Sequence, residues 1–156
     1  MKMSPQDKKL DAMLRSSMLV AGGFMGDDGR AVREVIEADA ATLRRCGINA
    51  AMVARRMREL TRLAGEGLGT WVDVDGGRLR VMSEDYKGLL VCPWGHSGRY
   101  NKRVTIVECP RSDRTLMWSD LNIHLIEVHG FFEGKGSTFR VEPEEAVEIL
   151  FGTDTN

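Results

Sequence analysis

Hydrophobic residues in the first 67 positions recur with the spacing of helices. Apolar side chains return every three or four residues, which places them on one helix face, in three segments: 4–19, 30–45 and 49–64. In the last segment the apolar stripe consists of Val53, Met57, Leu60 and Ala64. Gly47 suits a left-handed cap after the second helix, and Asn49 suits an N-cap for the third. The pattern therefore predicts a helical N-terminal part.

After Gly69 the pattern changes to the alternation of apolar and polar residues that is typical of strands. Segments 70–74 and 78–81 alternate on either side of Asp75-Gly76-Gly77, which predicts a hairpin because glycine adopts the positive φ of tight turns. Three further strand candidates follow: Gly88–Cys92, Arg103–Glu108 and Thr115–Trp118. Turn-rich segments separate them, so we expect an antiparallel meander of about five strands.

Two more helices are predicted near the C-terminus. The first is capped by Ser119 and extends to Val128, and the second begins at Glu142 with Pro143 in its first turn. The predicted fold class is α+β: N-terminal helices, then an antiparallel sheet of about five strands covered by two C-terminal helices.

Length and charge set limits on organisation and partners. The 156 residues carry a net charge of −1, with +3 on residues 1–67 and −4 on residues 68–156. We expect the first range to be the helical part and the second to be the sheet with its helices, in one compact domain. Neither half repels or strongly attracts nucleic acid.

Cysteine content and the first residues bear on location. Three cysteines, an odd number, in a chain that opens without an apolar export segment predict a reducing compartment, with the cytoplasm as the default. The apolar stretch Met18–Met25 is too short to span a bilayer. We therefore expect a cytoplasmic protein outside the membrane.

All three histidines and two of the three cysteines lie within thirty-eight residues: Cys92, His96, Cys109, His124 and His129. A structural zinc ion takes four such ligands at the corners of a tetrahedron. Cys92-Pro93-Trp94-Gly95-His96 resembles half of a zinc knuckle, and His124 and His129 share one predicted helix. These two histidines stand about 140° apart on an ideal helix, so we expect the helix to unwind near Gly130 if one ion binds both.

Sheet geometry selects among these ligands. If segments 88–92 and 103–108 pair antiparallel, Cys109 lies roughly 20 Å from Cys92, at about 3.3 Å per residue, and cannot share an ion with it. The next strand returns the chain toward Cys92. The candidate zinc site is therefore Cys92, His96, His124 and His129. No other cofactor is expected.

The same residues allow two other interpretations. In ordinary core packing Cys92 is a small buried side chain, and His124 packs beside a helix face formed by Leu121, Leu125 and Val128. In a catalytic site His96 or His124 would activate the Cys92 thiolate, or a three-ligand metal would activate water with Glu127 or Glu133 as base. Otherwise we expect both glutamates to be exposed to solvent.

The glycine-rich segment Gly130–Ser137 resembles a phosphate loop but lacks two of its features. A glycine separates Lys135 from Ser137, and the segment follows a helix instead of preceding one. We expect a helix stop and a crossing segment, with Phe131-Phe132 in the core. The alternative is an anion contact from Lys135, Ser137 and the neighbouring amides.

Three arginines lie opposite the apolar stripe of the third helix: Arg55, Arg58 and Arg62. Such a stripe would contact phosphates, and this helix with its predecessor fits helix-turn-helix dimensions. Glu59 is placed to pair with Arg55 and Arg62, however, and the whole chain is slightly acidic. Nucleic-acid binding through these arginines is therefore the weaker expectation.

Cys92-Pro93-Trp94-Gly95-His96 together with Leu121–Ser137 resembles small bacterial proteins of an uncharacterised family, over roughly residues 24–151. The resemblance implies a soluble bacterial protein and brings no activity with it. From the residues we expect a small cytoplasmic binding or regulatory protein, non-enzymatic and stabilised by one structural zinc ion, with a protein partner or self-association. A metal-dependent hydrolase is the first alternative, and a nucleic-acid-binding regulator is the second.

Overall fold

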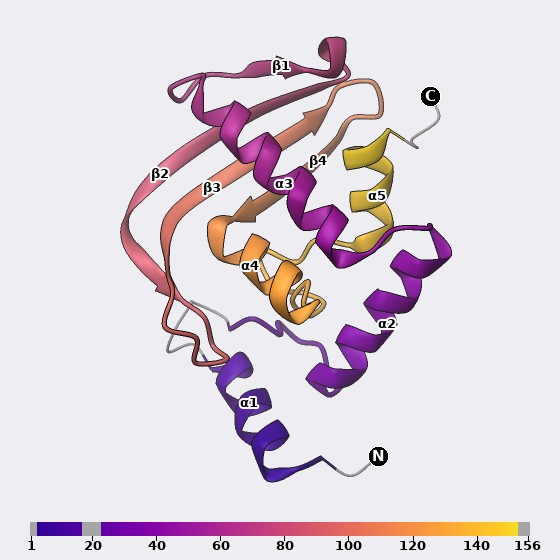
Figure 1. Cartoon of the computed structure of the whole chain (residues 1–156), viewed down its shortest axis with the longest axis vertical. Coiled ribbons are helices and arrows are strands. Elements are labelled where there is room, and N and C mark those ends of the chain that lie inside the picture. The colour runs from indigo at the N-terminus through magenta and orange to yellow at the C-terminus, as the bar shows by residue number, and fades with distance from the viewer. Residues whose placement is uncertain (1–2, 17–22, 153–156) are drawn as a thin grey trace.

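The computed structural model describes residues 3–16 and 23–152, which form an α+β fold, as predicted (Figure 1). The helices are α1 (Pro5–Arg15), α2 (Val32–Arg45), α3 (Ala50–Gly65), α4 (Asp120–His129) and α5 (Pro143–Phe151). The strands are β1 (Val72–Val74), β2 (Leu79–Val91), β3 (Arg99–Cys109) and β4 (Arg114–Ser119). A short 3-10 turn, η1 (Asp75–Gly77), joins β1 to β2. Residues 17–19 of the predicted first helix lie outside the described residues.

The sheet is an antiparallel meander in the order β1-β2-β3-β4, so the predicted count of about five strands is wrong by one. The predicted strands 78–81 and 88–92 belong to a single strand, β2, which pairs with β3 along most of its length. The polar segment between them has the composition of a turn. This polar segment is held in the strand by backbone hydrogen bonds to β3, which do not require apolar side chains. The register of the pairing shifts at a bulge between Asp85 and Leu89.

The local signals at the ends of elements are confirmed. Gly47 after α2 and Gly130 after α4 adopt positive φ, of 72° and 63°. The Asn49 side chain caps α3 by accepting a hydrogen bond from the Met52 amide at 2.9 Å. In η1, Gly76 has a φ of 65°, as the predicted hairpin requires.

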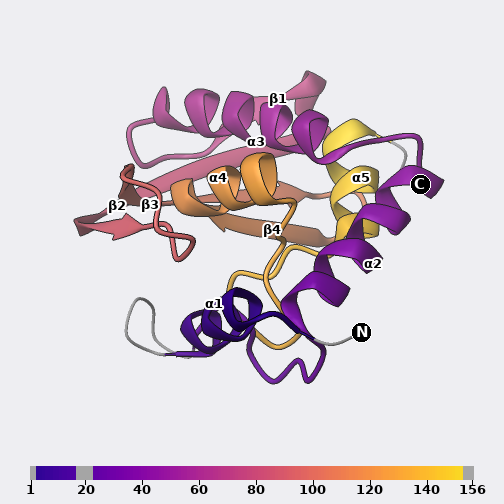
Figure 2. The ribbon, with the colours of Figure 1, turned by 60° about the horizontal axis from the view of Figure 1, so that its bottom comes forward.

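Helices α3 and α4 cover one face of the sheet, and α5 packs against α2 and α3 at the end of this layer (Figures 1 and 2). The strands bury alternate residues against these helices, at 0% exposure: Leu79, Val81, Val107 and Trp118. The predicted stripe of α3 is fully buried, as expected. The two C-terminal helices were expected to cover the sheet. Instead α3 and α4 contact the strands, and α5 packs against α2 and α3.

Helix α4 contributes to two hydrophobic clusters. Ile123 and Ile126 belong to the first cluster, which lies between the sheet, α3 and α5. Leu121 and Leu125 belong to the second, which α4 shares with α1, the start of α2 and the end of β2. The predicted face included Val128, which is 51% exposed. The helix is buried on two sides, so a single amphipathic stripe does not describe it.

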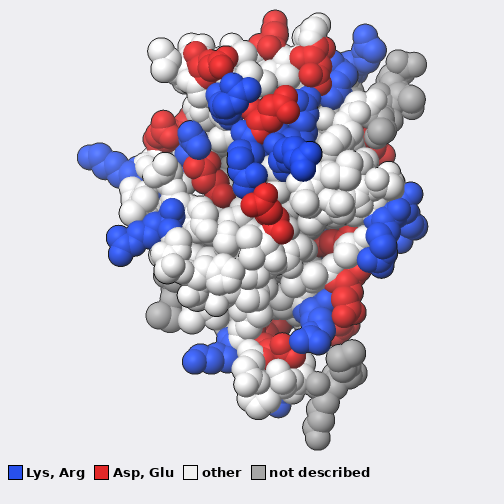
Figure 3. Space-filling model, in the orientation of Figure 1, with Lys and Arg blue, Asp and Glu red and all other residues white. Residues whose placement is uncertain are grey.

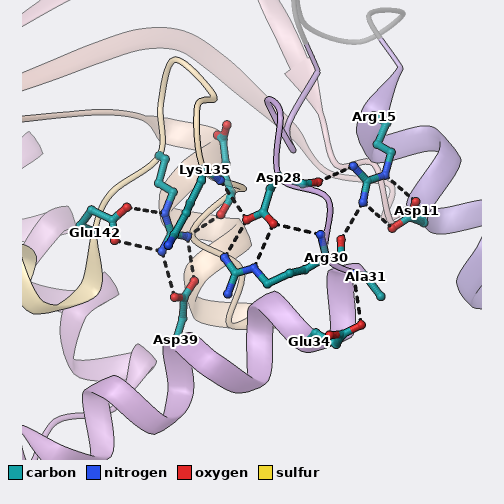
Figure 4. Close-up of polar contacts among 11 residues, drawn as sticks. Asp11, Arg15, Asp28, Arg30, Ala31, Glu34, Asp39, Lys135 and Glu142 are labelled. Carbon is teal, nitrogen blue, oxygen red and sulfur yellow. Dashed lines mark hydrogen bonds and ion pairs between the residues drawn. The ribbon is translucent and has the colours of Figure 1, made fainter. Parts of the chain in front are cut away.

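An ion pair and a backbone hydrogen bond fasten α2 and the chain before it to the segment between α4 and α5 (Figure 4). Both terminal nitrogens of Arg140 donate to Asp39 of α2 at 2.9 Å, and each side chain is only 6% exposed. Asp28 accepts hydrogen bonds from Arg30 and from the Lys135 amide. The chain before α2 is thereby joined to the chain after α4.

Candidate metal centre

The turn between β2 and β3 places Cys92 and His96 close together. β2 ends where Val91 pairs with Arg99, so Cys92 is the first residue of the turn. The Gly95 amide donates to the Cys92 carbonyl at 3.0 Å, and Gly95 has a φ of +88°. Glycine adopts this conformation at little cost, so the chain reverses at once and returns His96 toward Cys92.

Helix α4 brings His124 and His129 to the same turn. The helix persists through His129 and ends at the left-handed Gly130, so the two histidines reach the turn without the unwinding that was expected if one ion binds both. An ion midway between the two imidazoles lies only about 70° around the helix from each of them. Because an imidazole extends well beyond the backbone, both rings converge on the turn without distorting the helix.

The candidate ligand atoms form a compact group. One atom from each of Cys92, His96, His124 and His129 lies within 4.8 Å of the others, so these residues could hold a metal ion. The Cys92 Sγ atom is 3.5 Å from His129 Nε2. Tetrahedral zinc bonds of about 2.3 Å to sulfur and about 2.0 Å to nitrogen place these two ligand atoms about 3.5 Å apart. The pair therefore has the separation that zinc requires, and the widest separations must close by about 1.5 Å at most.

Cys109 lies apart from this group. Arg99 is the partner of Val91 beside the turn, and Cys109 follows ten residues later in β3, about 33 Å away at about 3.3 Å per residue. Cys109 belongs to the first hydrophobic cluster, whereas Cys92 belongs to the second. The separation of the two cysteines agrees with the sequence argument, which underestimated it because β3 is longer than predicted.

Burial favours the neutral imidazoles that a metal needs. Cys92 is 4% exposed, His124 and His129 are half-buried, and His96 is exposed. Burial, then the nearby His96, lowers the pKa of His124, and the same causes lower the pKa of His129 to about 4. Neutral imidazoles bind a metal without first losing a proton. The His124 Nε2 atom is buried and has no hydrogen-bond partner among the described residues, which a metal bond would remedy.

Two aromatic rings support the histidines. Trp94 stacks on His129 with ring centres 4.0 Å apart and planes 10° apart, and Tyr100 lies 4.7 Å from His124. Such contacts hold ligand rings in position. Sequence reasoning assigned neither residue to the site. The place of Trp94 between two candidate ligands was a usable signal, whereas the role of Tyr100 depends on how β3 faces α4.

Glu127 and Glu133, the two candidate general bases, have different environments. Glu127 is exposed, as expected, but Arg58 donates two hydrogen bonds of 3.1 Å to it and so lowers its pKa. The expected exposure of Glu133 is wrong, because its side chain is packed between loops and only 4% exposed. Asn122 and Ser137 donate to its carboxylate, while burial raises its pKa to about 7.

The glycine-rich segment after α4 packs against the chain before α2. A Cβ atom on Gly134 would lie 2.3 Å from the Met25 carbonyl oxygen, so these backbones approach as only glycine allows. The expected burial of Phe131-Phe132 is confirmed, at 0% and 2% exposure. The Lys135 amide and the Ser137 hydroxyl donate to carboxylates of the chain itself. Binding of an external anion by this segment stays a prediction.

The arginine stripe of α3 is interspersed with carboxylates. Figure 3 shows blue and red side chains side by side over this helix. Arg62 pairs with a glutamate one turn further on, at 3.4 Å. Glu59 pairs with Arg56 at 2.8 Å, so its expected pairing with Arg55 and Arg62 is wrong. Nucleic-acid binding through Arg55, Arg58 and Arg62 stays a prediction.

Comparison with protein-family models, with curated proteins and with solved structures finds no match for this chain. Among residues 3–16 and 23–152, no helix has the length and apolar character to cross a membrane.

Proposed function

We propose that this chain is a small zinc-binding protein in which one ion fastens the β2–β3 turn to α4 through Cys92, His96, His124 and His129. The observation that carries the proposal is the convergence of four ligand atoms within 4.8 Å from two distant segments. One thiolate and three imidazoles are a donor set that zinc prefers. The 3.5 Å separation of Cys92 Sγ and His129 Nε2 and the unpartnered His124 Nε2 support the same assignment.

The ion would act as a crosslink at the edge of the second hydrophobic cluster. Cys92 in the β2–β3 turn and Leu125 in α4 both belong to that cluster, so the ion would join two segments that already pack together. Four protein ligands fill the coordination of zinc and leave no position for a substrate, which is typical of structural sites. The proposed role is therefore a binding or regulatory protein of the cytoplasm whose fold depends on zinc, and not an enzyme.

The test is elemental analysis of untagged protein purified without chelator. We expect one zinc ion per chain, lost in Cys92→Ala and in His124→Ala. Cys109→Ala is the matched control, because Cys109 is also a buried cysteine but lies outside the group, and it should keep its zinc. Absence of metal from the unaltered protein, or equal loss in the Cys109→Ala control, would overturn the assignment.

A second measurement separates the structural role from a catalytic one. Loss of zinc together with a lower unfolding free energy in Cys92→Ala supports a structural ion, because zinc-binding free energy then contributes to folding free energy. Cobalt substituted for zinc should give the absorption of a tetrahedral, thiolate-bound ion that does not change between pH 6 and pH 9. These pH limits bracket the pKa of about 7 that zinc-bound water has in catalytic sites.

A metal-dependent hydrolase is the second candidate, favoured by the exposure of His96 alone among the four ligands. If water replaces His96, three ligands and an open position remain, as in catalytic zinc sites. Glu127, which lines the same pocket as His124, would then be the candidate base, although Arg58 weakens it by lowering its pKa. A cobalt spectrum that titrates near neutral pH and persists in His96→Ala would favour this candidate over the structural one.

A further inference from the structure

A pocket of about 620 Å³ lies where α3, α4 and the start of β3 meet. Its volume falls within the range of roughly 300–1,000 Å³ that is typical of small-molecule sites. The lining residues that bear on its chemistry are Arg58, Arg62, Tyr100, Arg103, His124 and Glu127. The pocket thus shares His124 with the candidate metal centre and contains two arginines of the α3 stripe.

Two of the guanidinium groups in this pocket are only weakly held. Arg58 pairs with Glu127 while their side chains are 55% and 39% exposed, and Arg62 pairs with Glu66 while theirs are 66% and 60% exposed. Ion pairs so exposed contribute at most about 1 kcal/mol. Arg58 and Arg62 lie one helical turn apart on the same wall, so a single doubly charged group can engage both.

The other walls combine a fixed charge with apolar surface. Arg103 donates two hydrogen bonds to Asp120, at 3.1 and 3.0 Å, and these side chains are less exposed than the Arg58–Glu127 pair, at 33% and 15%, so Arg103 is held more firmly. Tyr100 and Ile123 supply the apolar lining. An organic group attached to an anion would find a surface to pack against here.

We propose that this pocket binds a small phosphate ester, with the phosphate contacted by Arg58 and Arg62 and the organic group against Tyr100. Guanidinium groups bind phosphate through paired, charge-assisted hydrogen bonds. Glu127 is an internal competitor, because it occupies the guanidinium of Arg58 until the ligand arrives. The inference gives the proposed binding role a ligand class and rests on that role, but not on the presence of zinc.

The distribution of charge favours a small ligand over a polynucleotide. Arg55 does not line the pocket, although it belongs to the same stripe. Asp120 and Glu127 stand among the arginines, and Figure 3 shows acidic groups interspersed with basic ones over α3. A polynucleotide requires a continuous positive surface, whereas a single phosphate requires only two convergent guanidinium groups.

The experiment titrates inorganic phosphate and phenyl phosphate into the full chain and follows binding by calorimetry and by NMR shifts. We expect saturable binding, tighter for phenyl phosphate. Arg62→Ala should weaken it roughly tenfold, because a hydrogen bond to a charged group is lost. Glu127→Gln should strengthen it several-fold by removing the competitor. Arg55→Ala, the matched control on the same helix, should leave it unchanged.

Three results would overturn the proposal: no saturable binding, equal loss in Arg55→Ala and Arg62→Ala, or no gain in Glu127→Gln. Binding of a single-stranded oligonucleotide that falls steeply with salt and depends on Arg55 would instead assign the stripe to nucleic acid. Zinc content is measured on the same samples. Phosphate binding without zinc would overturn the metal site alone, and zinc without phosphate binding would overturn the pocket alone.

Discussion

Burial decides the chemistry of Glu133, which the sequence places in a polar, glycine-rich segment. Its carboxyl group is nearly enclosed, and burial raises its pKa from 4.5 to about 7. Hydrogen bonds from Asn122 and Ser137, and the charge of Arg140, partly offset this rise. The group therefore takes up a proton more readily in the folded chain than in the unfolded one.

The raised pKa of Glu133 predicts a fall in stability with pH. A carboxyl group whose folded pKa exceeds its unfolded pKa contributes fully below pH 4.5, and the contribution is lost as the pH rises through about 7. The loss amounts to at most about 3.5 kcal/mol, at about 1.4 kcal/mol per pKa unit. We expect the unfolding free energy of Glu133→Gln, taken by urea denaturation relative to the unaltered chain at the same pH, to increase from pH 5 to pH 8, because the lowered pKa values of His124 and His129 act equally in both chains.

The control for this measurement is Glu66→Gln, whose side chain is 60% exposed. It should keep the pH dependence of the unaltered chain. The same slope in Glu133→Gln as in the unaltered chain would show that Glu133 titrates normally.

Among the elements, the two glycine-rich loops act as one unit. The chain around Gly26 and the chain around Gly136 lie in backbone contact, and the Asp27 amide donates to the Lys135 carbonyl at 3.1 Å. This contact aligns the chain before α2 with the chain after α4. The glycines of the second loop thus serve packing between loops, which accounts for the loop-like composition without a bound phosphate.

A pair of glycine substitutions tests this contact. Gly26 and Gly47 both have positive φ, 56° and 72°, but a Cβ atom on Gly26 would lie 2.3 Å from the Ser137 amide nitrogen, whereas none lies within 4 Å at Gly47. Gly47→Ala should cost about 1–2 kcal/mol of unfolding free energy, the cost of left-handed backbone. Gly26→Ala should cost more than about 3 kcal/mol, because backbone must also move. Equal costs in chemical denaturation would contradict the close contact.

In the whole molecule, the metal centre lies beside the second of the two hydrophobic clusters that the described residues form. Cys92 belongs to the second cluster, and Trp94 and Tyr100 pack against it. The first cluster lies between the sheet and α3 and contains none of the four candidate ligands. Loss of the ion should therefore loosen the two parts of the fold unequally.

Removal of zinc by a chelator should raise amide hydrogen exchange in residues 92–98 and at the C-terminal end of α4. The buried part of α3 and its partner strands should stay protected, because regions open according to their own local stability. Mass spectrometry of peptides from the zinc-loaded and the chelated chain measures the difference. A uniform rise across the chain would mean that the ion supports the fold as a whole.

Much of the architecture follows from local sequence signals. Gly47 and Asn49 mark the boundary between α2 and α3, and the Asp75–Gly77 turn marks the hairpin, because these residues act through their own backbone or nearest amides. The four candidate ligands could be named as well, since the direction of the strands is enough to separate Cys109 from Cys92.

Only the tertiary structure decided which side chains lie inside and which charges meet. The polar middle of β2 remains a strand because β3 pairs with it, Val128 faces solvent because α4 is buried on two other sides, and Glu133 is buried beside Asn122 of α4, which donates to it. Likewise, Arg58 meets Glu127 across sixty-nine positions, and the pocket beside His124 forms only where three elements meet. The periodicity of hydrophobic residues and the capping of helices depend on a few neighbouring residues. Burial and ion pairing depend on contacts between distant segments, which no local pattern encodes.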